Sequence, residues 1–145
     1  MGGREIVSIL KNSPNGNALD LTSHNKKPVT FILMPHQDSW ILRNFLAENR
    51  VKIKKDTVVK DGGKYYDLIV ASASENKEKI FTETEIFTGK NSPVSRYYKD
   101  RLLARNKVLK KILDTANDKA ADQIKKEAAA VMGVLQDITE ETGEG

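Results

Sequence analysis

The sequence predicts an α/β protein in which part of a doubly wound sheet is followed by a coiled-coil-like α-helical hairpin. An uncharged run at residues 29–34, rich in β-branched and aromatic side chains, is typical of a strand buried on both faces of a parallel sheet. Two extended segments, 51–59 and 65–73, flank an Asp-Gly-Gly-Lys turn and predict a β-hairpin. Beyond residue 94, apolar residues recur at steps of three and four, which indicates two long helices.

Composition limits the classes of protein to which the chain can belong. Its 145 residues suffice for one domain with a modest core, and the absence of cysteine excludes disulfides and thiolate metal sites. No apolar run approaches the roughly 18 residues that span a bilayer, and the N-terminus lacks the apolar core of a signal peptide. We therefore expect a cytoplasmic protein, and no residue pattern suggests a bound metal.

The N-terminal part of the chain predicts one helix and an irregular connection. Residues 4–11 form an amphipathic pattern that ends at the turn-forming residues 12–17. Residues 18–27 show no regular period, and His24 among them has no second histidine or acid at ligand spacing. We therefore assign no function to His24.

The run at 29–34 organises the centre of the chain. Pro35 cannot donate a hydrogen bond within a sheet and so ends the strand, and residues 39–49 follow with the spacing of an amphipathic helix. Ligands of open α/β sheets bind beyond the carboxyl ends of the strands. The Pro35-His36-Gln37 turn is therefore a candidate site, in which His36 either serves a substrate through a hydrogen bond or proton transfer, or is a polar turn residue.

The predicted β-hairpin has one inner and one outer strand. Residues 68–71 are apolar on both faces, whereas lysines are frequent in 51–59, which is typical of an edge strand. The strand at 65–73 should therefore lie inside. Gly62 and Gly63 provide the positive φ angles of a tight turn. A phosphate-binding loop is the alternative, but such a loop needs a following helix, and none is predicted there.

The C-terminal part predicts a short strand or extended segment over 80–87 and then the helical hairpin, with Pro93 near the start of its first helix. The chain thus divides into residues 1–90 and 91–145. A polar break at Asn117-Asp118 separates the two helices. The seam between the helices is predicted to contain Tyr98, Leu102, Arg105, Leu109, Ile112, Ala116, Ala121, Ile124, Ala128, Val131, Leu135 and Ile138.

Basic side chains are concentrated on the first helix of this hairpin. They are Arg96, Lys99, Arg101, Arg105, Lys107, Lys110 and Lys111, with Asp100 the one acid among them. Such a stripe is the electrostatic footprint of nucleic-acid binding through phosphate contacts, and a solvated helix face is the plainer interpretation. The neighbouring Tyr97 could stack on a base, whereas Tyr98 belongs to the seam.

Three segments resemble one family closely. They are Phe31-Ile32-Leu33-Met34-Pro35-His36, the helix Trp40-Ile41-Leu42-Arg43-Asn44-Phe45-Leu46, and Val59-Lys60-Asp61-Gly62-Gly63-Lys64-Tyr65-Tyr66-Asp67-Leu68-Ile69-Val70-Ala71. In these segments the chain is similar to the bacterial tRNA (adenine(22)-N1)-methyltransferases, which use S-adenosylmethionine. The resemblance covers essentially the whole chain. It implies the C-terminal half of a Rossmann-like class I methyltransferase sheet followed by the helical hairpin, and hence methylation of N1 of an adenine in tRNA.

The resemblance also implies where the site residues lie. Met1-Gly2-Gly3 matches the end of the family's Gly-Met-Gly-Gly turn, which would put these residues at the methyl end of the cofactor S-adenosylmethionine. The family's Gln-Pro-Asn after the fifth strand corresponds to Met34-Pro35-His36, where only the proline is kept. Pro35 and His36 are therefore the implied catalytic residues. The basic residues of the first long helix are the implied tRNA contacts.

A further implication is that the chain is incomplete as an enzyme. The first strands of the family fold and its Gly-rich cofactor loop are absent, because the only adjacent glycine pairs are Gly2-Gly3 and Gly62-Gly63. We expect either a fragment or a start assigned to an internal methionine, with a separate N-terminal half as a candidate partner. The alternative function is a non-catalytic RNA-binding module or an inactive fragment of the methyltransferase.

Overall fold

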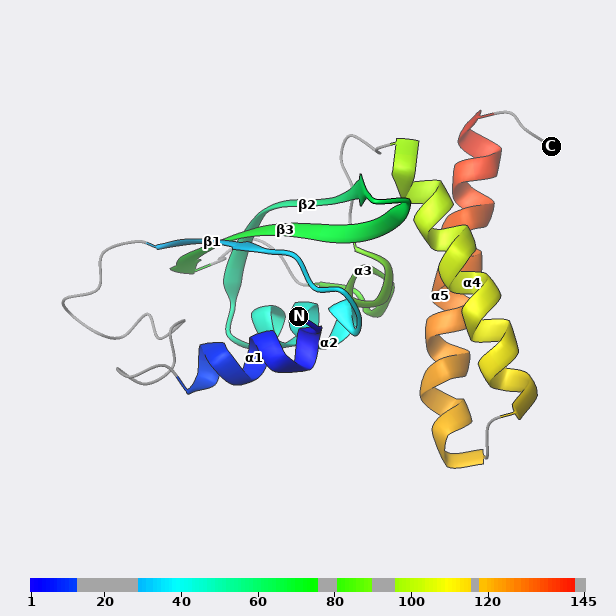
Figure 1. The fold of residues 1–145 in the computed structure, drawn as a ribbon, viewed down its shortest axis with the longest axis horizontal. Helices are drawn as coiled ribbons and strands as arrows, with labels where there is room; N and C mark the ends of the chain where they lie inside the picture. The colour runs from blue at the N-terminus through cyan, green and yellow to red at the C-terminus, as the bar shows by residue number, and fades with distance from the viewer. Residues whose placement is uncertain (13–28, 76–80, 90–95, 116–117, 143–145) are drawn as a thin grey trace.

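The computed structural model describes residues 1–12, 29–75, 81–89, 96–115 and 118–142 (Figure 1). Its elements are α1 (Gly3–Lys11), β1 (Thr30–Leu33), α2 (Ser39–Glu48), β2 (Val51–Asp61), β3 (Lys64–Glu75), α3 (Glu83–Thr88), α4 (Arg96–Thr115) and α5 (Asp118–Thr142). A twisted sheet lies over α1, α2 and α3, and α4 and α5 run side by side at one end of the sheet (Figure 1). The predicted order of helices and strands is therefore confirmed except at α3.

The sheet has the strand order β1-β3-β2, and its described pairs are antiparallel. β3 is the central strand and the lysine-bearing β2 lies at an edge, which confirms the predicted inner and outer strands. Gly62 and Gly63 have φ angles of 57° and 78°, as a tight hairpin turn requires. The alternative of a phosphate loop is wrong, because β3 and not a helix follows the turn.

β1 differs from the doubly buried parallel strand that its apolar run predicts. It pairs antiparallel with β3, its burial alternates along Thr30–Leu33, and Ile32 is 73% exposed. The reason is that, in the described part of the chain, helices cover only one face of the sheet (Figure 1). Phe31 and Leu33 pack against the core on that face, and Ile32 points away from it.

The main core lies between the sheet and the helices α1 and α2. Leu42 and Leu46 of α2 are fully buried together with Ile69 and Ala71 of β3, and Ile6 of α1 closes the cluster. Each fully buried leucine stabilises the fold by about 1.5–3 kcal/mol. This packing holds the end of β1 and the start of α2 in place, and the loop between them forms part of the site.

α3 replaces the strand or extended segment that was predicted over residues 80–87. The Thr82 hydroxyl accepts a hydrogen bond from the N–H of Glu85 at 3.1 Å, so Thr82 is a helix N-cap. The acidic side chains of Glu83 and Glu85 also suit the positive end of the helix dipole. The helix stops at Gly89, which has a φ angle of 75° and which lies so close to Arg43 that a Cβ atom there would come within 2.6 Å of that side chain. The prediction was wrong because these helix-capping signals were not weighed against the apolar residues at the two ends of the segment.

The helical hairpin has the predicted seam. Leu102 and Leu109 of α4 are fully buried with Val131 of α5, and Leu135 and Tyr98 join them. Of the other predicted apolar seam residues of α5, Ile124, Ala128 and Ile138 are partly buried against this cluster, and Ala121 is buried outside it. The cluster also contains Val58, and Tyr65 packs on it, so the hairpin is attached to the turn end of β2 and β3.

Some predictions concern residues that lie outside the described part of the chain. These are most of the turn at 12–17, the irregular connection over 18–27 with His24, the helix start near Pro93, the seam residue Ala116 and the break at Asn117. Among the described residues, no helix is long and apolar enough to cross a membrane. The same residues contain no group of three or more histidines, cysteines or acids that could hold a metal ion.

Candidate active site between the sheet and the helical hairpin

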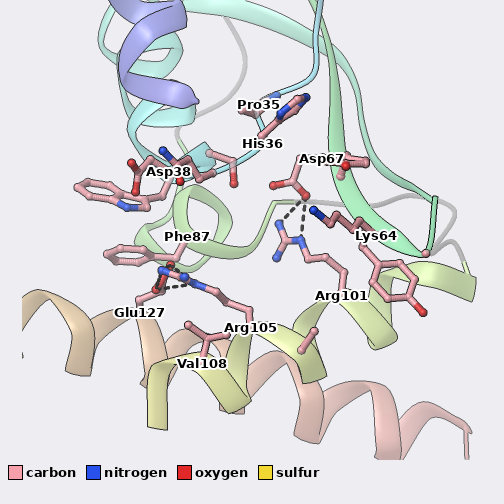
Figure 2. Close-up of a pocket in the computed structure, with 17 residues that line it drawn as sticks. Pro35, His36, Asp38, Lys64, Asp67, Phe87, Arg101, Arg105, Val108 and Glu127 are labelled. Carbon is pink, nitrogen blue, oxygen red and sulfur yellow. Dashed lines mark hydrogen bonds and ion pairs between the residues drawn. The ribbon is translucent and has the colours of Figure 1, made fainter. Parts of the chain in front are cut away.

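A cavity of about 470 Å³ lies where the loop after β1, the turn end of β3, and helices α3 and α4 meet (Figure 2). This size is in the range of small-molecule and cofactor sites. Its wall combines aromatic rings with charged side chains. The lining residues that carry the discussion below are Pro35, His36, Trp40, Lys64, Tyr66, Asp67, Phe87, Arg101, Arg105 and Glu127.

One wall is formed by the loop that follows β1, which the chain's N-terminus holds in place. The N–H of His36 donates to the carbonyl of Met1 at 2.9 Å, and the N–H of Gly3 donates to the carbonyl of Gln37 at 2.7 Å. The start of α1 and the end of β1 are therefore adjacent. The structure thus brings together the two sequence-predicted sites, Met1-Gly2-Gly3 and Pro35-His36.

The glycine turn is tightly packed against this loop. A Cβ atom on Gly3 would lie 2.1 Å from the carbonyl oxygen of Asp38, which is too close for any side chain. The N–H of Gly2 donates to the Glu5 carboxylate at 3.3 Å, so both glycine N–H groups have partners within the protein. The N–H groups of Gly2 and Gly3 are therefore already used within the protein. The turn could serve a cofactor only because its glycines take up little space beside the loop.

Replacing Gly3 by Ala is expected to destabilise the protein by about 1–3 kcal/mol, because the loop must move to admit the methyl group. The measurement is urea unfolding of the Gly3→Ala variant against the parent. Gly133→Ala is the matched control, because nothing lies within 4 Å of a Cβ at that helical position. The control should be about 0.5–1 kcal/mol more stable than the parent. A Gly3→Ala variant as stable as the parent would contradict the tight contact.

His36 and Pro35 differ in exposure. Pro35 is buried, whereas His36 is exposed and its ring lies 5.0 Å from the ring of Tyr66 at an angle of 46°. His36 is one of the residues that line the cavity, and it lies beside Pro35 at the edge of the close-up (Figure 2).

The cavity is also lined by aromatic residues that the sequence did not identify as site residues. The rings of Trp40 and Phe87 lie 5.5 Å apart at 41°, and both line the cavity. Trp40 was noticed only as an apolar helix position, and Phe87 lay in the segment for which a strand was predicted. Tyr66 was likewise treated as a strand residue. Their shared signal was aromatic character next to predicted turns, which is too general to identify a site.

A buried charge network ties α2, the sheet and α4 together behind the cavity. Arg43 is 2% exposed and pairs with Asp56 at 2.9 Å and with Asp67 at 3.2 Å. Arg101 reaches the same Asp67 carboxylate at 2.6 Å (Figure 2). Burial by itself raises the pKa of Asp67, but the attraction of Arg43 and Arg101 outweighs burial and holds that pKa below its usual range. The lowered pKa favours the charged carboxylate, which is the shared partner of two guanidinium groups.

The same balance applies to Arg43. Burial by itself lowers the pKa of the guanidinium, and the nearby carboxylates of Asp67 and Asp56 more than compensate, so the net pKa is raised. The Arg43 side chain also donates to the carbonyl of Ile86 in α3 at 3.4 Å. Arg43 thus connects α2 with the sheet, through Asp56 and Asp67, and with α3, through Ile86.

Two of the predicted RNA-contacting residues are used inside the protein. Arg101 is paired with Asp67, and Arg105 binds the buried carboxylate of Glu127 on α5 at 2.8 Å. The other predicted contacts that are exposed on α4 are Arg96, Lys107, Lys110 and Lys111, and Lys99 is half-buried. The basic stripe therefore contains two groups of residues. Arg101 and Arg105 form ion pairs within the protein, whereas the other members are exposed or half-buried.

Comparison with known proteins identifies the family. The family model described as tRNA (adenine(22)-N(1))-methyltransferase matches residues 1–137. The chain belongs to this family. No curated protein matches it in a sequence search. The family expected from the three quoted segments is therefore confirmed.

Solved structures similar to this methyltransferase-family chain share its fold. A Streptococcus agalactiae protein of the NADB-Rossmann superfamily has 21% identity and a TM-score of 0.70, with 93% of this chain and 56% of that one covered. An uncharacterized Listeria monocytogenes protein has 24% identity and a TM-score of 0.71, with 93% and 60% covered. TrmK of M. capricolum, in complex with S-adenosyl-homocysteine, has 21% identity and a TM-score of 0.69, with 93% and 56% covered.

These neighbours confirm the Rossmann-like methyltransferase fold class. At such identities the likeness is evidence for the fold alone. The chain spans less than two thirds of the length of each of these neighbours, between 56% and 60%.

Proposed function

We propose that this chain takes part in the transfer of a methyl group from S-adenosylmethionine to N1 of an adenine in tRNA, in the cytoplasm. Membership of the methyltransferase family supports the reaction type. The single observation that carries the proposal is the junction of the Met1-Gly2-Gly3 turn with the Pro35-His36 loop, joined by hydrogen bonds of 2.9 Å and 2.7 Å beside a cavity. Residues 1–90 would then supply the target-base side of the site, and residues 91–145 the tRNA-binding helical hairpin.

The aromatic wall is suited to a nucleobase. Trp40, Phe87 and Tyr66 line the cavity together with His36, and stacking of a base on an aromatic ring contributes about 1–3 kcal/mol. Methylation at N1 leaves the adenine positively charged, and aromatic faces attract a cation. We infer that these rings hold the adenine before the reaction and stabilise its charged form afterwards.

The protein's part in catalysis is alignment. S-adenosylmethionine, when bound, supplies the methyl group, with Met1-Gly2-Gly3 at its methyl end. Pro35 and His36 would fix the base from the other side, with His36 donating a hydrogen bond to the base or taking up a proton. Holding two reactants in contact in a site that excludes water removes much of the entropic barrier to their reaction. A His36→Ala variant with full turnover would contradict the role of His36.

The exposed basic residues of α4 suit the tRNA backbone. Arg96, Lys107, Lys110 and Lys111 are exposed, and phosphate contacts of this kind give affinity that falls steeply with salt. Lys99 belongs to the same proposed set. Arg101 and Arg105 would act mainly by shaping the cavity wall, because carboxylates already neutralise them. A further N-terminal half, comparable to the portion of the neighbours that this chain does not match, would supply the remaining cofactor contacts.

The experiment that tests the proposal is calorimetric titration of S-adenosylmethionine into the purified chain, with binding of labelled tRNA measured beside it. We expect tRNA affinity to fall about 100-fold between roughly 50 and 200 mM salt, as about five phosphate contacts imply. Micromolar cofactor binding would support the enzyme directly. Salt-dependent tRNA binding without cofactor binding would support only the part of the proposal that concerns tRNA binding. Absence of both would contradict the proposal.

A further inference from the structure

We propose that the turn end of the β2–β3 hairpin is a second RNA-contacting surface, which receives the phosphates next to the base that enters the cavity. The surface, here named the hairpin-tip cluster, consists of Lys60, Lys64, Tyr65, Arg96 and Tyr97. The inference rests on the proposed function, because it takes the cavity to hold a nucleotide of tRNA. It adds a second element, the β-hairpin, to the helix that carries the basic stripe.

Two of the three cations in the cluster, Lys60 and Arg96, lie over aromatic rings. The rings of Tyr65 and Tyr97 are 6.1 Å apart, the Lys60 Nζ lies 5.6 Å from the Tyr65 ring centre, and the Arg96 Cζ lies 4.6 Å from that of Tyr97. Arg96 also donates a hydrogen bond to the Tyr97 hydroxyl. The tyrosines fasten the hairpin to α4, while Lys60, Lys64 and Arg96 remain exposed.

The cations of the hairpin-tip cluster differ from Arg43, Arg101 and Arg105 because, in the described part of the chain, they are not paired with carboxylates. Arg43, Arg101 and Arg105 bind carboxylates, whereas no ion pair joins Lys60, Lys64 or Arg96 to an acid within the described residues. The acidic neighbours in sequence, Asp61 and Asp100, are exposed. A cation resting on an aromatic face keeps its charge unneutralised and so can still bind phosphate.

The cluster is continuous with the cavity. Lys64 and Tyr65 line the cavity, and the Lys64 side chain extends toward Asp67 and Arg101 at its edge (Figure 2). The adjoining turn is open, because nothing lies within 4 Å of a Cβ atom built on Gly62 or Gly63. An RNA strand with one base in the cavity can therefore pass over the Gly62-Gly63 turn without a steric obstacle.

The test uses the double variant Lys60→Gln/Lys64→Gln and measures tRNA affinity over a range of salt concentrations. Removal of two phosphate contacts should weaken binding about tenfold near physiological salt and reduce the slope of log affinity against log salt by about 1.4. The matched control is Lys52→Gln/Lys54→Gln. It removes the same charge from exposed positions near the start of β2, the end of that strand away from α4 (Figure 1).

The outcomes separate this inference from the proposed function. A reduced affinity and slope in the hairpin-tip variant, with the control close to the parent, would support the inference. Equal affinities in both variants and the parent, or equal losses in both, would overturn it while tRNA binding itself stands. Failure of the parent chain to bind tRNA would overturn the proposed function and this inference together. Thermal unfolding of both variants should match the parent, since the substituted side chains are exposed.

Discussion

The Asp67→Asn variant is expected to lose about 3–5 kcal/mol of unfolding free energy, which is the range for breaking a buried ion pair from one side. Asp67 is buried and binds both Arg43 and Arg101, at 3.2 Å and 2.6 Å. Removing its charge leaves Arg43, which is 2% exposed, with Asp56 as its remaining carboxylate partner. The cost arises mainly because a buried guanidinium loses compensation, not because the ion pair is itself strongly stabilising.

The measurement is the midpoint and slope of urea unfolding for Asp67→Asn against the parent. Asp61→Asn is the matched control, because Asp61 is an exposed aspartate on the same β-hairpin. Its unfolding free energy should change by no more than about 0.5 kcal/mol. Similar values for both variants would mean that Asp67 does not hold the network together.

The same carboxylate predicts a dependence of stability on pH. The pKa of Asp67 is lowered in the folded state, so the folded protein holds this proton less tightly than the unfolded chain does. Its stabilising contribution is therefore fully present above the ordinary aspartate pKa of about 4 and is lost as the pH falls through the lower folded-state pKa. Stability measured from pH 7 downward should fall less steeply below about pH 4 in Asp67→Asn than in the parent.

The Leu102→Ala variant is expected to lose about 2–5 kcal/mol, because it opens a cavity in the seam between α4 and α5. Leu102 is 0% exposed and packs in one cluster with Leu109 and Val131. The same cluster contains Tyr98, whose hydroxyl donates to the carbonyl of Gly89 at 2.8 Å. Removal of the Leu102 side chain should therefore also weaken the contact between α4 and Gly89 at the end of α3.

The adjacent Leu103 provides the control. It is 47% exposed on the same helix, and Leu103→Ala should change the unfolding free energy by about 0.5 kcal/mol or less. Urea unfolding of the two variants side by side removes any difference in helix propensity, because the substitution is the same. A Leu103→Ala variant as unstable as Leu102→Ala would show that the helix faces its partner differently.

The sequence predicted an element correctly where the signal lies within that element's own residues, as with a helical period or a turn sequence. The period of α4 and α5 identified the seam with Leu102, Leu109 and Val131, and the Gly62-Gly63 turn identified the β-hairpin. Lysines in β2 indicated the edge strand for a similar reason, since exposed positions tolerate charge. The failures were of two kinds. The helix-capping signals at Thr82 were not weighed against the apolar residues of that segment, and β1 has a covering layer on one face only.

Local patterns in the amino-acid sequence were enough to predict the family, the order of elements other than α3, the hairpin seam and the loop after β1. Which charged side chains pair inside the protein depends on the folded chain. Arg101 and Arg105 look like surface cations in a basic stripe, and only the fold brings Asp67 and Glu127 within 2.6 Å and 2.8 Å of them. It also brought Trp40 and Phe87 to the cavity that His36 lines. The physical reason is that periodicity is a property of neighbours along the chain, whereas ion pairs and cavities join residues that lie far apart in it.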